Sequence, residues 1–297
     1  MEPRHLDLLR ELSEHGSVTA VARATHRTAS AVSQQLRTAE RHFGLPLVEP
    51  AGRGVRLTDA GRLLAEGGRD VAEVLARVQA RWDEFRGQPT GTVTVAALPS
   101  AATFLLPGVF RDLAGLPIEV DCTDVDLAED VYPTLTKDFD VVVGHSLSRT
   151  LPSGTSDQVT VVLAREPLDI ALAADHPLAR RRSVAAEDLA DQEWVGVPLG
   201  YPFDTVRLAV EEAVGRAVEV PLRLRDNRLI EALVADSRRV AVLPRFTTPS
   251  GSVVLRPLSG IATARYIYAV ARPDRAERLA VRRVLAALRT AGAAHDA

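Results

Sequence analysis

The chain has 297 residues and a formal net charge of −3; 46% of the residues are hydrophobic and 25% are charged. This composition is that of a globular protein, and the length suits a small domain joined to a larger one. The single cysteine, Cys122, excludes an intrachain disulfide, and no Cys or His spacing fits a zinc site. We therefore expect neither a metal nor a cofactor.

The N-terminal stretch does not resemble an export signal. Residues 1–12 (MEPRHLDLLREL) form an amphipathic segment broken by charges, unlike the apolar centre of a secretory signal. No apolar run approaches the roughly 20 residues that a membrane span needs. We therefore expect a cytoplasmic protein without a membrane partner.

Three helices are expected at the N-terminus, over Pro3–His15, Val18–Ala24 and Ala29–Phe43. In the third helix, Val32, Leu36 and Ala39 recur at helical spacing and define a buried stripe. Ser17 and Thr28 precede the second and third helices, where their hydroxyls can accept a free backbone N–H as N-caps. The short turn between these two helices has the length found in helix-turn-helix motifs.

The opposite face of the third helix carries side chains suited to DNA. They are two short hydroxyls, an amide and two guanidiniums: Ser30, Ser33, Gln34, Arg37 and Arg41. Gln can bond bidentately to adenine and Arg to guanine, and small Ser residues let a helix lie close to the groove. The local charge supports this interpretation, because residues 23–56 hold six Arg and two Glu, or +4 in a chain of −3.

The motifs of this segment resemble those of one family. Residues 29–36 (ASAVSQQL), 39–40 (AE), 43–44 (FG) and 57–61 (LTDAG) resemble the N-terminal winged helix-turn-helix of LysR-type transcriptional regulators. The resemblance extends over most of residues 4–65. It implies that Ala29–Phe43 is the recognition helix and that Pro50–Arg56 is the wing. Val48 and Pro50 depart from the Phe and Arg that are common in the family.

The residues and the resemblance together predict which side chains contact promoter DNA. The expected set is Ser17, Thr28, Ala29, Ser30, Ser33, Gln34, Arg37, Arg41, Arg53 and Arg56. Gln34 and Arg37 are expected to bond to base edges. Arg53 and Arg56 of the wing are expected to contact the DNA backbone or the minor groove.

A long helix is expected next, capped by Thr58 and reaching about Arg86. Its apolar residues follow a seven-residue repeat, with Gly61 and Gly68 at the other seam positions: Leu57, Leu64, Val71, Leu75, Val78, Trp82 and Phe85. This seam needs a partner, either the rest of the chain or a second copy, and we expect the second copy. Gly67 and Gly68 indicate a bend or a close helix approach. The resemblance implies a homodimer on an inverted repeat and assembly into a homotetramer.

Beyond a break at residues 88–91 (QPTG), strands and helices alternate, which is typical of an open α/β fold with mostly parallel sheets. The expected strands are Thr92–Leu98, Ile118–Cys122, Phe139–Val143, Val159–Ala164, Leu168–Ala174, Trp194–Val197, Val218–Leu224, Val240–Leu243, Val253–Leu255 and Tyr266–Ala271. The expected helices are Ala101–Leu113, Val184–Leu189, Phe203–Ala213, Asn227–Ala235 and Arg275–Ala291.

Residues 92–297 resemble the effector-binding half of the same family, which is similar to the two-lobed type 2 periplasmic binding proteins. The matching pieces are residues 176–179 (HPLA) and 242–244 (VLP). Ser237, Arg238 and Arg239 stand where the family has glycines, so we expect a different shape at this corner. The expected division is a DNA-binding domain at 1–58, a linker helix at 59–88 and an effector-binding domain at 92–297. Lobe one comprises about 92–164 plus 266–297, and lobe two about 165–265.

A small-molecule effector is expected between the two lobes, because ligands of open α/β sheets bind at the carboxyl ends of strands and at helix N-termini. The residues at such places are Pro99, Ser100, Ala101, Thr103, His145, Ser146, Gly200, Tyr201, Pro202, Phe203, Asn227 and Arg228. Tyr201 and Phe203 suit an apolar or aromatic body, and Arg228 suits a carboxylate, which is one candidate effector.

The function predicted is therefore a LysR-type DNA-binding regulator that responds to a small molecule. The alternative is a small-molecule sensor or solute-binding protein that does not read DNA, which the missing export signal disfavours. Catalysis is not expected, because the sequence has no nucleophile elbow, glycine-rich phosphate loop or zinc-protease motif.

Overall fold

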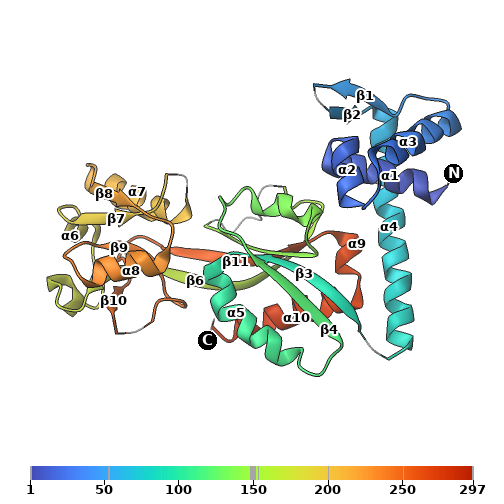
Figure 1. Ribbon diagram of the computed structural model, residues 1–297. Helices are drawn as coiled ribbons and strands as arrows, with labels where there is room; N and C mark the ends of the chain where they lie inside the picture. Colours follow the sequence, from blue (N-terminus) through green and yellow to red (C-terminus); the bar gives the residue numbers. More distant parts are fainter. Residues whose placement is uncertain are drawn as a thin grey trace.

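The computed structural model describes residues 2–52, 54–87, 89–147, 152, 154–199, 201–249 and 251–295, and the side chain of Pro202 is not described. An N-terminal helical domain is joined by one long helix to two α/β lobes arranged side by side (Figure 1). No described helix is both long and apolar enough to cross a bilayer.

The N-terminal domain contains α1 (Pro3–His15), α2 (Val18–Ala24) and α3 (Ala29–Phe43), with the bounds predicted from the sequence. Ser17 and Thr28 are the N-caps, accepting the N–H groups of Ala20 (3.1 Å) and Ala31 (3.2 Å). A two-stranded antiparallel wing follows, formed by β1 (Val48–Ala51) and β2 (Gly54–Leu57). Inward-facing residues of all these elements form one core: Leu8, Leu9, Leu12, Val21, Val32, Leu36, Ala39, Leu47 and Leu57.

The long helix α4 (Asp59–Phe85) has two environments. Its first half packs against α1, and Thr58 caps it as predicted. In its second half Ala80 is buried, but five large apolar side chains are exposed: Val74, Leu75, Val78, Trp82 and Phe85, with Phe85 82% exposed. We call these five residues the α4 stripe. The predicted seam is thus buried within the chain from Leu57 to Gly68, and the α4 stripe has no packing partner on another element among the described residues of one chain.

Two glycines allow α4 to lie close to its neighbours. A Cβ on Gly61 would lie 2.1 Å from the Leu47 carbonyl oxygen, and one on Gly68 would lie 2.5 Å from that of Leu6. Of the two alternatives predicted for Gly67 and Gly68, a close helix approach is confirmed at Gly68.

Lobe one is built around a parallel β4–β3–β5 arrangement. Its elements are β3 (Gly91–Ala97), α5 (Pro99–Asp112), β4 (Ile118–Asp124), the 3-10 helix η1 (Tyr132–Lys137), β5 (Val141–Ser146), α9 (Pro273–Ala276) and α10 (Leu279–Ala293). The helices α5 and α10 pack against each other and share a core with the strands. The single helix predicted over Arg275–Ala291 is wrong, because Glu277 and Arg278 separate α9 from α10.

Lobe two has its own core, centred on buried residues such as Trp194, Leu189 and Ile230. Its elements are the 3-10 helix η2 (Pro177–Arg180), α6 (Ala186–Leu189), β7 (Glu193–Gly196), α7 (Pro202–Val214), β8 (Glu219–Arg223), α8 (Asn227–Ala235), β9 (Ala241–Pro244) and β10 (Val253–Arg256). At the corner after α8 the backbone avoids positive φ. Instead, Ser237 Oγ donates to the Leu233 carbonyl (2.6 Å) and accepts from the Arg239 N–H (3.2 Å).

Two long strands, β6 (Val159–Ala173) and β11 (Ala264–Ala271), connect the lobes (Figure 1). The first part of β6 pairs with β11, and its second part pairs with β9 and β10 in lobe two, always antiparallel. The expectation of mostly parallel sheets is therefore wrong at this crossing. The two strands predicted over 159–174 are one strand, because Glu166 and Pro167 continue the pairing with β11 instead of forming a turn.

Replacing Gly68 by Ala is expected to destabilise the full chain by about 1–3 kcal/mol, since overpacking forces the helix away from the Leu6 carbonyl. Gly67→Ala is the matched control. Beyond its chain neighbours and the local helix backbone, no described atom lies within 4 Å of its added Cβ, and Ala favours a helix interior over Gly by up to about 1 kcal/mol. Urea unfolding of the two variants measures both effects. Equal midpoints for both would contradict the close packing of α4 on α1.

Candidate functional site

The outer face of α3 is open to solvent. Ala29, Ser30, Gln34, Arg37 and Arg41 are exposed, and Ser33 is half-buried. Arg41 is held along the helix by a hydrogen bond from Nη2 to Thr38 Oγ1 (3.1 Å). The side chains of Gln34 and Arg37 make no hydrogen bond to any described residue, so both are available to an external ligand.

Gln35, which is not among the predicted DNA contacts, anchors the face beside it. Its Nε2 donates to the Arg4 carbonyl (2.7 Å), and its Oε1 accepts from Arg27 in the turn before α3. Arg4, Arg27, Gln34 and Gln35 line one groove between α1 and α3. The signal available in the sequence was the glutamine pair, since one member lies on the open face and the other at its margin.

The wing was predicted to carry two cations, Arg53 and Arg56. Arg53 lies outside the described residues. Arg56 is exposed on β2 and donates to Glu49 Oε1 through Nε (2.9 Å) and Nη2 (2.8 Å). An exposed pair of this kind is weak. A phosphate can therefore replace Glu49 as the partner of Arg56 at small cost.

A cavity of 380 Å³ lies between the lobes. Eight predicted residues line it: Pro99, Ser100, Thr103, His145, Tyr201, Phe203, Asn227 and Arg228. Ala101 does not, because its side chain is fully buried in the core of lobe one. Ser146 is buried outside the lining, while Gly200 and the Pro202 side chain lie outside the described part of the chain.

Other lining residues were not predicted: Leu98, Asp126, Val197, Arg225, Asp226, Glu231, Thr247, Thr248 and Arg265. Most of them lie in loops whose path the strand pattern does not reveal. Arg265 is different, because it is a charged residue inside a buried strand. The predicted strand began one residue later, at Tyr266, which hid this signal.

Arg265 is the buried centre of the cavity wall, with 1% of its surface exposed. Its Nε and Nη2 donate to Glu166 Oε2 (2.7 and 2.6 Å), and Nη2 also donates to Ser100 Oγ (2.8 Å). The guanidinium lies 5.3 Å from the centre of the Phe203 ring. Glu166 is fully buried and also accepts the Phe246 N–H (2.8 Å). The buried charge is thus compensated by a carboxylate and further hydrogen bonds.

His145 is a neutral member of this wall. Burial, aided by the positive charge of Arg265, lowers the pKa of His145 to about 3. Its Nδ1 lies 3.3 Å from Arg265 Nη1, and a guanidinium only donates, so Nδ1 is the acceptor and Nε2 carries the proton. Nε2 is buried with no described partner.

Several charged side chains of the cavity, most of them from lobe two, are not part of a buried ion pair. Arg225 lies over the Tyr201 ring, 5.2 Å from its centre, and Arg228 is exposed at the start of α8. Asp226 accepts the N–H groups of Arg228 (2.8 Å) and Leu229 (3.0 Å), which caps that helix. Burial raises the pKa of Asp126, against the opposing charges of Arg225 and Arg265. The cavity therefore offers guanidiniums, an aromatic ring and one carboxyl group with weakened acidity.

Comparison with curated proteins finds relatives along most of the chain. The small neutral protease regulatory protein of Streptomyces coelicolor is 30% identical over 268 residues, covering 86% of this chain and 81% of that protein. The hydrogen peroxide-inducible genes activator of Pectobacterium carotovorum subsp. carotovorum is 23% identical over 261 residues, covering 84% and 82%.

Solved structures share the fold. A full-length OxyR variant from Pseudomonas aeruginosa superposes with a TM-score of 0.65 at 20% identity, covering 97% of this chain and 95% of that one. Full-length CbnR complexed with its target DNA gives a TM-score of 0.52 at 20% identity, covering 97% and 100%.

Two family models match the chain in succession. Residues 3–62 match the bacterial regulatory helix-turn-helix protein of the lysR family, and residues 86–293 match the LysR substrate binding domain. The second match alone spans more than half of the chain. The chain therefore belongs to the LysR family of transcriptional regulators, which bind promoter DNA and respond to small-molecule effectors, and it is not an enzyme.

Proposed function

We propose that the chain acts as a homodimer, assembling further into a homotetramer, that binds an inverted repeat in promoter DNA in the cytoplasm and responds to a small carboxylate in the cavity. The functional parts are residues 1–58 for DNA binding, 59–88 for pairing and 92–297 for effector binding. One observation carries the proposal: the open face of α3 and the inter-lobe cavity occur in one chain whose family regulates transcription.

DNA reading is supported by the polar face of α3. The side chains of Gln34 and Arg37 are exposed and make no hydrogen bond to another described residue. They can therefore bond to the edges of DNA bases without breaking an internal contact. This surface disfavours the alternative of a sensor that does not read DNA, because such a protein needs no open polar helix beside a cationic turn. In an inverted repeat, the second copy brings a second α3 to the neighbouring half-site.

A carboxylate effector is supported by Arg225 and Arg228 at the cavity, since guanidiniums bind carboxylates bidentately. Tyr201 and Phe203 add ring faces for an apolar or aromatic body. The volume of 380 Å³ suits a small metabolite.

Thiol-based peroxide sensing is not part of the proposal, although one similar protein is named for hydrogen peroxide. Cys122 lies half-buried on β4, and burial with the nearby carboxylates of Asp124 and Asp121 raises its thiol pKa. A thiolate is the reactive form of cysteine, and this surrounding disfavours it.

Base readout is tested by footprinting the protein on DNA upstream of its own gene, followed by titration of the protected site. Gln34→Ala and Arg37→Ala are expected to lose about 1–3 kcal/mol of discrimination between the operator and mutated operators. Arg56→Ala is expected to weaken binding to all DNA sequences alike. It is also expected to lower the slope of log affinity against log salt concentration by about one unit per lost phosphate contact. Arg216→Ala, a remote exposed cation paired with Asp191, is the control. Absence of salt-sensitive, sequence-dependent binding would exclude the proposal.

Pairing through the α4 stripe is tested with the double variant Val78→Glu, Trp82→Glu. Two charges placed in an apolar seam are expected to weaken the dimer at least about 100-fold, as measured by sedimentation. Glu66→Lys changes an exposed charge on the other side of the same helix and is expected to leave the dimer intact. If both variants remain dimeric, the interface lies elsewhere.

Effector binding is tested by thermal unfolding in the presence of a panel of small carboxylates. A ligand at 100 times its Kd adds about 2.7 kcal/mol of stability, which is readily seen as a raised Tm. Arg228→Ala and Arg225→Ala are expected to abolish the shift, and Arg216→Ala to preserve it. A shift that survives both cavity variants would place the ligand outside the cavity.

A further inference from the structure

A buried set of charges joins the DNA-binding domain to lobe one of the same chain, far from the cavity. Arg10 and Glu14 come from α1, and Arg272 and Asp274 from the start of α9. We call these four residues the latch. Arg10 Nη1 donates to Asp274 Oδ2 (3.1 Å), and Arg272 donates to Asp274 (2.8 and 3.0 Å) and to Glu14. The four side chains are only 10% to 20% exposed.

The latch is largely shielded from solvent, as the low exposure of its four side chains shows. Burial raises the pKa of the Glu14 carboxyl to about 7, against the opposing charge of Arg10. In a site of this kind a lost partner leaves an uncompensated charge, so breaking a contact has a large effect.

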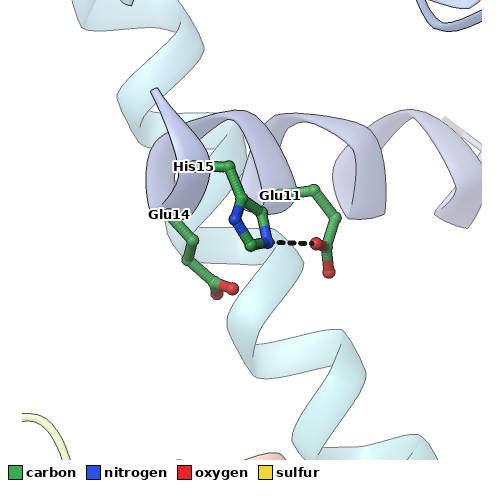
Figure 2. A group of neighbouring side chains, drawn as sticks. All are labelled: Glu11, Glu14 and His15. Atoms are coloured by element: carbon green, nitrogen blue, oxygen red, sulfur yellow. Dashed lines mark ion pairs between the residues drawn. The ribbon is translucent and has the colours of Figure 1, made fainter. Parts of the chain in front are cut away.

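Guanidiniums, not a metal ion, balance the acids at the end of α1. Glu11, Glu14 and His15 bring their ligand atoms within 4.8 Å of one another, and His15 Nε2 lies 3.3 Å from Glu11 Oε2 (Figure 2). Arg10, however, donates to Glu11 (2.6 Å), and Arg272 donates to Glu14. Both carboxylates are already engaged, which favours a structural role for this group.

The strand β11 connects the latch to the cavity. Arg265, in the cavity wall, is the second residue of β11, and Arg272 follows its last residue directly. At about 3.3 Å per residue the two arginines are about 23 Å apart. Between them β11 is paired on both sides, with β5 and β6, and four successive residues from Tyr268 to Ala271 are buried. A displacement of the strand at one end therefore reaches the other.

The latch has space and partners for a second arrangement. A cavity of 140 Å³ borders it, and its other charged lining residues are Arg69, Glu73, Lys137 and Asp157. Exchange of ion-pair partners is a known form of two-state switch at interfaces. The cores of lobe one and of the DNA-binding domain need not be repacked for it.

We propose that the latch is the contact through which the inter-lobe cavity sets the orientation of the DNA-binding domain within its own subunit, with β11 as the connecting element. This inference rests on the proposed function, in which the cavity holds the effector. Closing or opening the lobes shifts Arg265 with β11, and the two contacts that cross to α1, Arg272 with Glu14 and Asp274 with Arg10, are then kept or released. The DNA affinity of the chain depends on which arrangement the latch adopts.

A double-mutant cycle on operator binding tests this without an effector. Asp274→Asn perturbs the latch, and Ser100→Ala removes a hydrogen bond to Arg265 at the cavity. Each is expected to change operator affinity by at least about fivefold, the lower range of allosteric coupling. The double variant is expected to differ from the product of the two changes by at least about threefold. Independent sites this far apart give simple products.

The control is Asp191→Asn, an equal change at an exposed pair in lobe two, which is expected to combine multiplicatively with Ser100→Ala. If Asp274→Asn is poorly folded in urea unfolding, Glu14→Gln replaces it, since its amide oxygen still accepts from Arg272. Multiplicative behaviour of both latch variants would overturn the proposal. The proposed function fails separately, if no operator is bound or if no carboxylate raises the Tm.

Discussion

A guanidinium buried between two lobes must keep a carboxylate beside it, and the pair of Arg265 and Glu166 meets this condition at the centre of the molecule. Arg265 lies on β11 and Glu166 on β6, the two strands that connect the lobes. The pair therefore holds the crossing strands in register while Arg265 also contacts Ser100 and His145 at the cavity. Removing either charge would leave the other buried without its counter-charge, which is strongly unfavourable. The shape of the cavity depends on this pair.

Local patterns in the sequence were sufficient wherever a residue's role depends on its immediate neighbours. The bounds of α1, α2 and α3 follow from hydrophobic spacing and from the caps Ser17 and Thr28. The long helix was visible for the same reason, and the close approach at Gly68 was one of the two alternatives that its glycine pair indicated. Strand direction was not, because pairing between β6 and β11 joins residues about 100 positions apart, as Arg265 and Glu166 do. Judged alone, the residues Arg165–Pro167 are typical of a break between two strands. Only their pairing with β11 shows that the strand continues through them.

The candidate sites divide in the same way. Tyr201, Phe203 and Arg228 were predicted because they start helices that follow strands, and they do line the cavity. Arg225 and Asp126 reach it through loop paths that no periodicity encodes. On the DNA-binding side, the sequence indicated the cations of α3 and the wing. It did not indicate that Arg56 would be paired with Glu49. Nor did it indicate that Gln35 would connect the turn to α1 by hydrogen bonds, since both contacts depend on side-chain placement in three dimensions.

The division of α4 into a packed half and an exposed half has a consequence for assembly. The core of the DNA-binding domain closes within one chain, using Leu57 and Ala65 of the α4 region, while the α4 stripe stays open. A newly made subunit can therefore fold its DNA-binding domain before it meets a second copy. Under the proposed pairing, occupation of both halves of an operator then rises with the square of the free subunit concentration. At low abundance, a modest change in synthesis would produce a much larger change in promoter occupancy.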